Sequence, residues 1–174
     1  MKGIHHTGII VSDLDRSIGF YHDVLGLPFA TEPGPVVDDP ELGPKLGVPG
    51  AKLRMVAFQV GDDVLELLEY VEPESPITAP VPQNALGAHH VGFHVDDIHA
   101  KVDDLAAKGV DFLGDVTAID DGVLAGWRWV YFKDPDGITL ELVEVAYSRS
   151  EERRTNIARY LAERELDQRQ TMEA

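Results

Sequence analysis

The chain has 174 residues and a formal net charge of −16, from 31 acidic against 15 basic side chains, and it contains no cysteine. A surface with this charge repels phosphate groups, so neither nucleic acid nor an anionic membrane is expected as a partner. Without cysteine, disulfides and sulfur-ligated metal sites are excluded, and a metal ion would have to be held by nitrogen and oxygen. No apolar leader and no apolar run of ~20 residues is found, which predicts a soluble, cytoplasmic protein.

The first predicted elements are a strand over residues 4–11 and a helix that follows it directly. Ser12 and Asp15 have the spacing of a capping pair at the helix start. Apolar residues then recur at helical spacing, and Gly26 is expected to end the helix. Two strands near 53–60 and 64–71, preceded by a shorter one, complete this part of the chain.

The second half repeats this order of elements. A strand is expected to begin at His90. Asp96 or Asp97 is expected to cap the helix that follows, and Gly109 is expected to end that helix. Three more strands are expected at residues 112–118, 127–133 and 138–145. The segment from Asp134 to Gly137 reads Asp-Pro-Asp-Gly, a strong signal for the turn between the last two strands.

Two repeated motifs in the sequence indicate that the two halves are copies of one module. A histidine, a glycine, a valine and an aspartate recur at a constant offset of 84 (6/90, 8/92, 11/95, 13/97). Downstream, Leu-Glu-Leu-Leu-Glu at 65–69 is matched by Leu-Glu-Leu-Val-Glu at 140–144. We therefore expect modules at 1–72 and 87–147, joined by a proline-rich linker at 73–86.

These modules are expected to form a single domain over residues 1–147. The remaining residues, 148–174, are highly charged and predict a weakly amphipathic C-terminal helical extension.

The alternation of strand residues selects four side chains as a candidate metal site. Leu65 and Leu67 face the helices in this reading, so Glu66 lies on the other face of its sheet. The same argument applies to Glu141 and to both repeated histidines, which gives the set His6, Glu66, His90 and Glu141. A lone histidine on a strand is usually structural, but a core has no reason to require one twice at matched points. Imidazole and carboxylate ligands suit a divalent nickel, cobalt, manganese, zinc or iron ion.

The residues quoted above resemble the vicinal oxygen chelate superfamily over roughly residues 4–147. Members include glyoxalase I, methylmalonyl-CoA epimerase, extradiol dioxygenases, and fosfomycin and bleomycin resistance proteins. The stretch from Val64 to Gly109 is most similar to the epimerase branch, whereas Phe-Lys-Asp-Pro-Asp-Gly followed by Leu-Glu-Leu is closer to glyoxalase I.

The resemblance implies an α+β fold in which two tandem βαβββ modules form a curved mixed sheet around the metal, with helices outside. It also implies a homodimer, and metal ligands at His6, Glu66, His90 and Glu141.

The site and the resemblance together predict a metal-dependent isomerase, epimerase or glyoxalase-type lyase acting on a small-molecule carbonyl substrate. A proton next to the metal-bound carbonyl would be removed through an enediolate, with Glu66 or Glu141 as general base. The alternatives are an Fe(II) extradiol-type dioxygenase, for which Glu66 is a surplus ligand, and a non-catalytic binding or antibiotic-resistance protein.

The substrate is left open by the sequence. No run of basic residues indicates a CoA or glutathione site, and epimerisation of a keto-cyclitol or keto-sugar fits the chemistry equally well. Trp127, Trp129 and Tyr131 alternate along one strand and indicate either a pocket wall or aromatic core, the commoner case. His94 lies on the same face of its strand as His90. It is expected either to line the pocket or to belong to the core or the surface.

Overall fold

The computed structural model describes residues 3–122, 124–145, 158 and 162. Apart from Ala158 and Ala162, the predicted helical extension at 148–174 therefore lies outside the described residues. The elements in chain order are β1 (His6–Ile10), α1 (Leu14–Ile18), η1 (Gly19–Val24), β2 (Phe29–Thr31), α2 (Leu42–Lys45), β3 (Lys52–Val60), β4 (Asp63–Glu72), β5 (His90–His94), α3 (Ile98–Ala107), β6 (Thr117–Ala118), β7 (Arg128–Lys133) and β8 (Thr139–Glu144).

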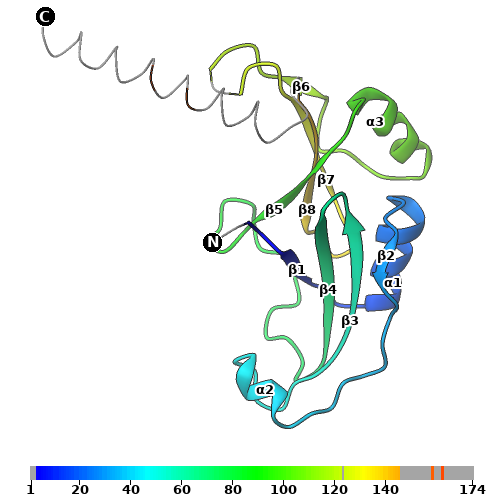
Figure 1. The fold of residues 1–174 in the computed structure, drawn as a ribbon, viewed down its shortest axis with the longest axis vertical. Helices are drawn as coiled ribbons and strands as arrows, with labels where there is room; N and C mark the ends of the chain where they lie inside the picture. The colour runs from blue at the N-terminus through cyan, green and yellow to red at the C-terminus, as the bar shows by residue number, and fades with distance from the viewer. Residues whose placement is uncertain (1–2, 123, 146–157, 159–161, 163–174) are drawn as a thin grey trace, which may run out of the picture. The chain divides into compact units, whose positions relative to one another are not determined.

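This order gives two four-stranded sheets, each with one main helical segment, and it confirms the α+β class and the repeated βαβββ pattern (Figure 1). The first sheet has the strand order β1-β4-β3-β2 and the second the order β5-β8-β7-β6. In the first sheet β1 is parallel to β4, and β3 is antiparallel to both β4 and β2. Corresponding strands thus occupy corresponding places in the two sheets.

The helix of the first module begins one residue later than predicted. Asp13, not Ser12, is the N-cap, because its carboxylate accepts a hydrogen bond from Arg16 N in α1. Asp15 does not complete a capping box; its carboxylate binds the guanidinium of Arg54 instead. The helical segment continues through the π-helix η1, and Gly26, with a φ of 81°, ends it as expected.

In the second module the prediction was correct for Asp97, whose side chain caps α3 by accepting from Ala100 N. Gly109, with a φ of 87°, follows the end of α3 as expected. The strand expected at 112–118 is shorter. Only Thr117–Ala118 forms β6, and Phe112 makes an isolated bridge to Phe132, because a bend around Gly114 interrupts the pairing.

Each sheet buries its helix-facing side chains. The core of the first sheet includes Ile9, Val56, Phe58, Leu65 and Leu67, each at most 2% exposed. The core of the second includes Ile98, Val130, Phe132, Leu140 and Leu142, also at most 2% exposed. One face of each sheet is therefore closed by apolar packing, and the opposite face carries the less buried side chains.

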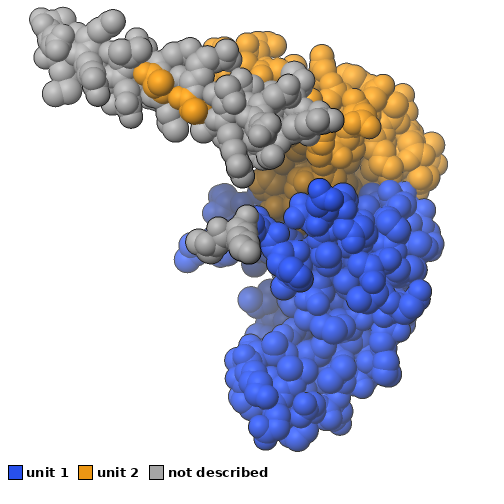
Figure 2. All heavy atoms as spheres, viewed as in Figure 1, with its two compact units in different colours: residues 1–89, 133–139 blue, residues 90–132, 140–174 orange. Residues whose placement is uncertain are grey.

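The chain divides into two compact units, residues 1–89 with 133–139 and residues 90–132 with 140–174 (Figure 2). The hairpin tip of 133–139 thus belongs to the first unit. There, the carboxylate of buried Asp134 accepts a hydrogen bond of 3.0 Å from the hydroxyl of Tyr21. Asp136 accepts hydrogen bonds from Ser12 and Arg16 at the start of α1.

The single-domain organisation over 1–147 and the linker at 73–86 remain predictions. Among the described residues, no helix has the length and apolar character needed to cross a bilayer.

Candidate active site

The open face of each sheet carries the predicted ligands. In β1, Ile9 is 1% exposed, while His6 on the other face is exposed. In β4, Leu65 and Leu67 are buried and Glu66 between them is only partly covered. The strand alternation inferred from the sequence is thus correct for the first module.

The first unit brings His6 and Glu66 together. Because β1 and β4 are parallel neighbours in which Gly8 pairs with Glu66, the imidazole of His6 reaches the carboxylate diagonally. The distance from His6 Nε2 to Glu66 Oε2 is 4.0 Å, and the side chains are 50% and 26% exposed. His5 Nδ1 lies 2.9 Å from His6 Nδ1, so one ring donates to the other and Nε2 of His6 is left to face Glu66.

The second unit brings His90 and Glu141 together in the same way, but more closely. The distance from His90 Nε2 to Glu141 Oε2 is 3.2 Å, with side chains 42% and 14% exposed. Burial raises the pKa of Glu141, and the neighbouring His90 opposes this rise.

A glycine stands beside each glutamate on the adjacent strand. A Cβ on Gly92 would lie 3.2 Å from Glu141 Oε2, while a Cβ on Gly8 would lie 3.9 Å from Glu66 Oε2. We call Gly8 and Gly92 the spacer glycines, because each leaves room for the neighbouring carboxylate. Both belong to the repeat with an offset of 84, so their positions could be found from the sequence. Which glutamate lies beside each of them depends on the strand register.

The open face of the second unit also carries two aromatic rings that the sequence left between core and pocket wall. Trp129 and Tyr131 alternate with buried Val130 and Phe132 on β7, so they lie on the side of β7 opposite the core. The ring of Tyr131 meets the ring of His90 edge to face, with centroids 5.2 Å apart. The pKa of Tyr131 is raised, mainly by burial and further by the charge of Glu141. The pocket-wall interpretation is therefore favoured over aromatic core.

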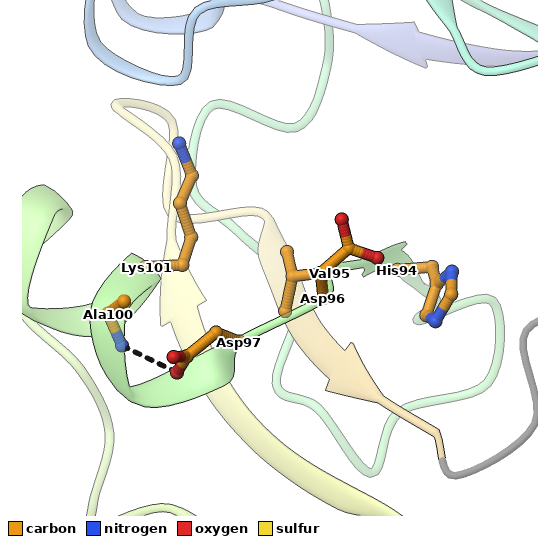
Figure 3. Close-up of a pocket in the computed structure, with 6 residues that line it drawn as sticks. All are labelled: His94, Val95, Asp96, Asp97, Ala100 and Lys101. Carbon is orange, nitrogen blue, oxygen red and sulfur yellow. Dashed lines mark hydrogen bonds between the residues drawn. The ribbon is translucent and has the colours of Figure 1, made fainter.

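A separate hollow of about 440 Å³, open to solvent, lies where β5 leads into α3. It is lined by His94, Asp96, Asp97 and Lys101 among others, and Figure 3 shows His94 and Lys101 on opposite sides of it. None of the four predicted ligands lines it, and Asp97 is occupied in capping α3. This hollow is therefore not the predicted site.

The donors present suit a divalent metal ion. Each pair offers one imidazole nitrogen and one carboxylate oxygen on an open sheet face, which is the donor chemistry of first-row divalent ions. Within the described residues, no group of three or more histidines, aspartates or glutamates lies close enough to hold a metal. Each pair on its own supplies two ligands.

Comparison with known proteins identifies the family. The model of the "Glyoxalase/Bleomycin resistance protein/Dioxygenase superfamily" matches residues 3–142. A 2-epi-5-epi-valiolone epimerase from Actinomyces sp is 35% identical over 92% of this chain and 88% of its own. A mitochondrial methylmalonyl-CoA epimerase of Mus musculus is 34% identical, over 80% and 71% respectively. A lactoylglutathione lyase of Haemophilus influenzae is 30% identical, over 84% and 96%.

A solved structure agrees with the fold. The crystal structure of a glyoxalase family protein from Bacillus cereus superposes with a TM-score of 0.69, covering 83% of this chain and 94% of that one at 24% identity. At this identity the likeness concerns the fold alone, and it matches the two-sheet α+β architecture described above.

Proposed function

The chain belongs to the Glyoxalase/Bleomycin resistance protein/Dioxygenase superfamily and is an enzyme of its epimerase or lyase type, and from this premise we propose that it moves a proton at the carbon next to a carbonyl group. The substrate is a small molecule. The single observation that carries the proposal is the repeated pair of imidazole and carboxylate, His6 with Glu66 and His90 with Glu141, one on the open face of each unit.

We propose that the two pairs act as one set of ligands for a divalent metal ion. His6 and His90 would anchor the ion through Nε2, the atom that each directs at its glutamate. When bound, such an ion stabilises negative charge on a carbonyl oxygen, which makes the neighbouring carbon more acidic. The imidazole and carboxylate donors predict that this ion is nickel, cobalt, manganese, zinc or iron.

Glu66 and Glu141 are the proposed proton carriers. A carboxylate oxygen can remove a proton from one face of the carbon, and a second carboxylate can return a proton to the other face. This division of labour inverts the carbon, which is the reaction of an epimerase. Return of the proton to the adjacent carbon instead gives the glyoxalase-type outcome, and the similarity to a lactoylglutathione lyase keeps that as the second candidate.

The two other classes predicted from the sequence have less support. An extradiol-type dioxygenase uses two histidines and one carboxylate, so one of the two equivalent glutamates would be surplus. A binding protein without catalysis has no need of two matched pairs. The predicted homodimer and cytoplasmic location stay proposals, and sedimentation of the purified chain would measure the first.

The test is proton exchange in D2O, followed by proton NMR, with metal-loaded protein and a panel of three compounds: methylmalonyl-CoA, a hemithioacetal of glutathione and a keto-cyclitol. We expect the α-proton signal of at least one compound to disappear with wild-type protein. Glu141→Gln should lower the exchange rate by about 100-fold or more, since a positioned base contributes 10²–10⁴-fold. Glu66→Gln is the matched variant from the other unit.

The metal content of each variant is measured beside its rate, because a lost ligand and a lost base both slow exchange. Wild-type protein that exchanges none of the three compounds, or a metal-loaded Glu141→Gln protein with full activity, contradicts the proposal.

A further inference from the structure

The open face of the second unit differs from that of the first in its aromatic content. We define the aromatic shelf as Trp129 and Tyr131, whose ring centroids lie 4.9 Å apart. Tyr131 also contacts His90. The rings of Tyr131 and Trp129 therefore form a continuous surface that extends away from the pair of His90 and Glu141. In the first unit, β3 presents Ala57 opposite Glu66 and Met55 two residues before it, so no ring lies at the corresponding positions.

The hairpin of β7 and β8 sets the shelf beside Glu141. Its turn end is closed by the hydrogen bond from Asp134 N to Ile138 O, and its open end by the ion pair of Arg128 with Glu144. Counting inward from both ends places Tyr131 opposite Glu141. A molecule that offers its reacting carbon to Glu141 would therefore extend over Tyr131 toward Trp129.

The charges around the shelf indicate which molecules it suits. In the described part of the second unit the cationic side chains are Lys101, Lys108 and Arg128. The two lysines pair with Asp104 on α3, and Arg128 pairs with Glu144, whose carboxylate also accepts from Ile98 N at the start of that helix. All three thus lie on the helix side of the sheet. On the shelf face, β7 carries Lys133 at its turn end, where the ammonium donates to Thr139 Oγ1, and β5 carries His90 beside Tyr131. None of these cations lies on the shelf face at the Trp129 end, so that end suits an uncharged group.

We propose that the aromatic shelf is the specificity site of the second unit and binds the carbon–hydrogen face of an uncharged ring, so that the substrate is a cyclic polyhydroxy ketone. This inference rests on the proposed proton transfer and adds the substrate class to it. Aromatic rings pack well against the apolar face of such a ring, while its hydroxyls stay at the rim in contact with water. A thioester of CoA carries phosphates, and the described lysine on this face, Lys133, donates to Thr139 at the turn end of β7, away from Trp129.

The test combines kinetics with tryptophan fluorescence, with 2-epi-5-epi-valiolone as probe and the full-length, metal-loaded chain. The chain has two tryptophans, so Trp129→Leu leaves Trp127 as the remaining indole. We expect the probe to quench wild-type fluorescence and Trp129→Leu to lose that quenching. The KM for exchange of the α-proton should rise about tenfold or more in Trp129→Leu, with kcat changed far less.

Two further variants separate stacking from general damage. Trp129→Phe keeps a ring and should recover most of the affinity. Phe112→Leu removes a ring that contacts Phe132 on the helix side of β7, so it should leave KM unchanged.

The inference and the proposed function can fail separately. Quenching by the probe without exchange of any proton would contradict the proposed function and leave the shelf supported. An unchanged KM in Trp129→Leu, or exchange with methylmalonyl-CoA but not with the cyclic ketone, would overturn the shelf while proton transfer stands.

Discussion

At the scale of single residues, the two ligand pairs are equivalent in sequence but not in environment. The contact of His90 with Glu141 is 0.8 Å shorter than that of His6 with Glu66, from 3.2 Å and 4.0 Å. Glu141 is also the less exposed carboxylate, at 14% against 26%. Its position is therefore held by closer neighbours, and changes beside it should matter more than the same changes beside Glu66.

Alanine substitution of the two spacer glycines tests this asymmetry directly. In Gly92→Ala the new methyl group would stand 3.2 Å from Glu141 Oε2 and 3.4 Å from Val143 Cγ2, so the carboxylate must shift. In Gly8→Ala the nearest atoms are at 3.5 Å and 3.9 Å, an ordinary contact. We expect Gly92→Ala to weaken metal binding by about 10–100-fold, as for other neighbours that orient a ligand, and Gly8→Ala to change it little.

Calorimetric titration with Ni²⁺ measures this difference, and stability provides its control. Neither glycine has a positive φ, so alanine fits the backbone of both strands and should not destabilise them. Equal metal affinity in the two variants would show that the gap beside Glu141 does not hold the carboxylate in place.

At the scale of elements, the hairpin tip between β7 and β8 is anchored by a buried carboxylate. Asp134 is 5% exposed and accepts from Tyr21 and from the backbone of Asp136 and Ile138. Burial raises the pKa of Asp134 above its usual value, and these hydrogen bonds only partly oppose the rise. The tip is therefore a segment whose stability depends on pH.

The sign of that dependence follows from the raised pKa. An acid whose pKa is higher in the folded state contributes stability that is fully present below its unfolded value of about 3.9. This contribution is lost as the pH rises through the folded value. Asp134→Asn removes this titration. The free energy of unfolding of the variant, relative to that of the wild type, should therefore increase as the pH rises through this window, and the difference should be constant at higher pH.

Urea unfolding from pH 4 to 7 measures the difference, with Asp111→Asn as an exposed carboxylate control. A gap between Asp134→Asn and wild type that is constant, or that narrows with rising pH, would contradict the expected sign. The variant keeps the acceptor for both backbone donors, because one oxygen, Oδ1, accepts from Asp136 N and Ile138 N.

The elements also show how far the sequence could predict this fold. The strand faces were correct because alternation of apolar and polar residues is local and survives tertiary packing. The first cap was assigned to Ser12 because its spacing to Asp15 fits a capping box, but Arg54 on β3 takes Asp15 and Asp136 takes Ser12. Those partners lie 39 and 124 residues away along the chain, so local spacing could not reveal them.

The candidate site was predictable to a similar extent. The four proposed ligands were selected from the repeat, which can be found without a structure. The open-face position of Trp129 and Tyr131 was not decided by the sequence, because two aromatics at alternate positions fit a core equally well. The spacer role of Gly92 depends on which residue of β8 lies beside it, and a single sequence does not contain strand register.

At the scale of the whole molecule, each unit has its own core and its own proposed ligand pair, so a bound metal ion would link the units functionally only if both pairs held the same ion. Alanine at His6 and at His90, singly and together, distinguishes the possibilities through metal-dependent stability. The two imidazoles are 50% and 42% exposed, so their removal leaves both cores intact.

A saturating metal stabilises the folded chain by about 2.7 kcal/mol at 100 times its dissociation constant, which appears as a rise in Tm. If all four ligands hold one ion, His6→Ala alone should remove most of the rise that Ni²⁺ produces, His90→Ala should do the same, and the double variant should lose no more. Two independent pairs would instead give partial losses that add in the double variant. Thermal melts of the two single variants and the double variant, with Ni²⁺ and with EDTA, measure these losses. Additive losses would contradict a single four-ligand centre and would indicate two separate weak sites.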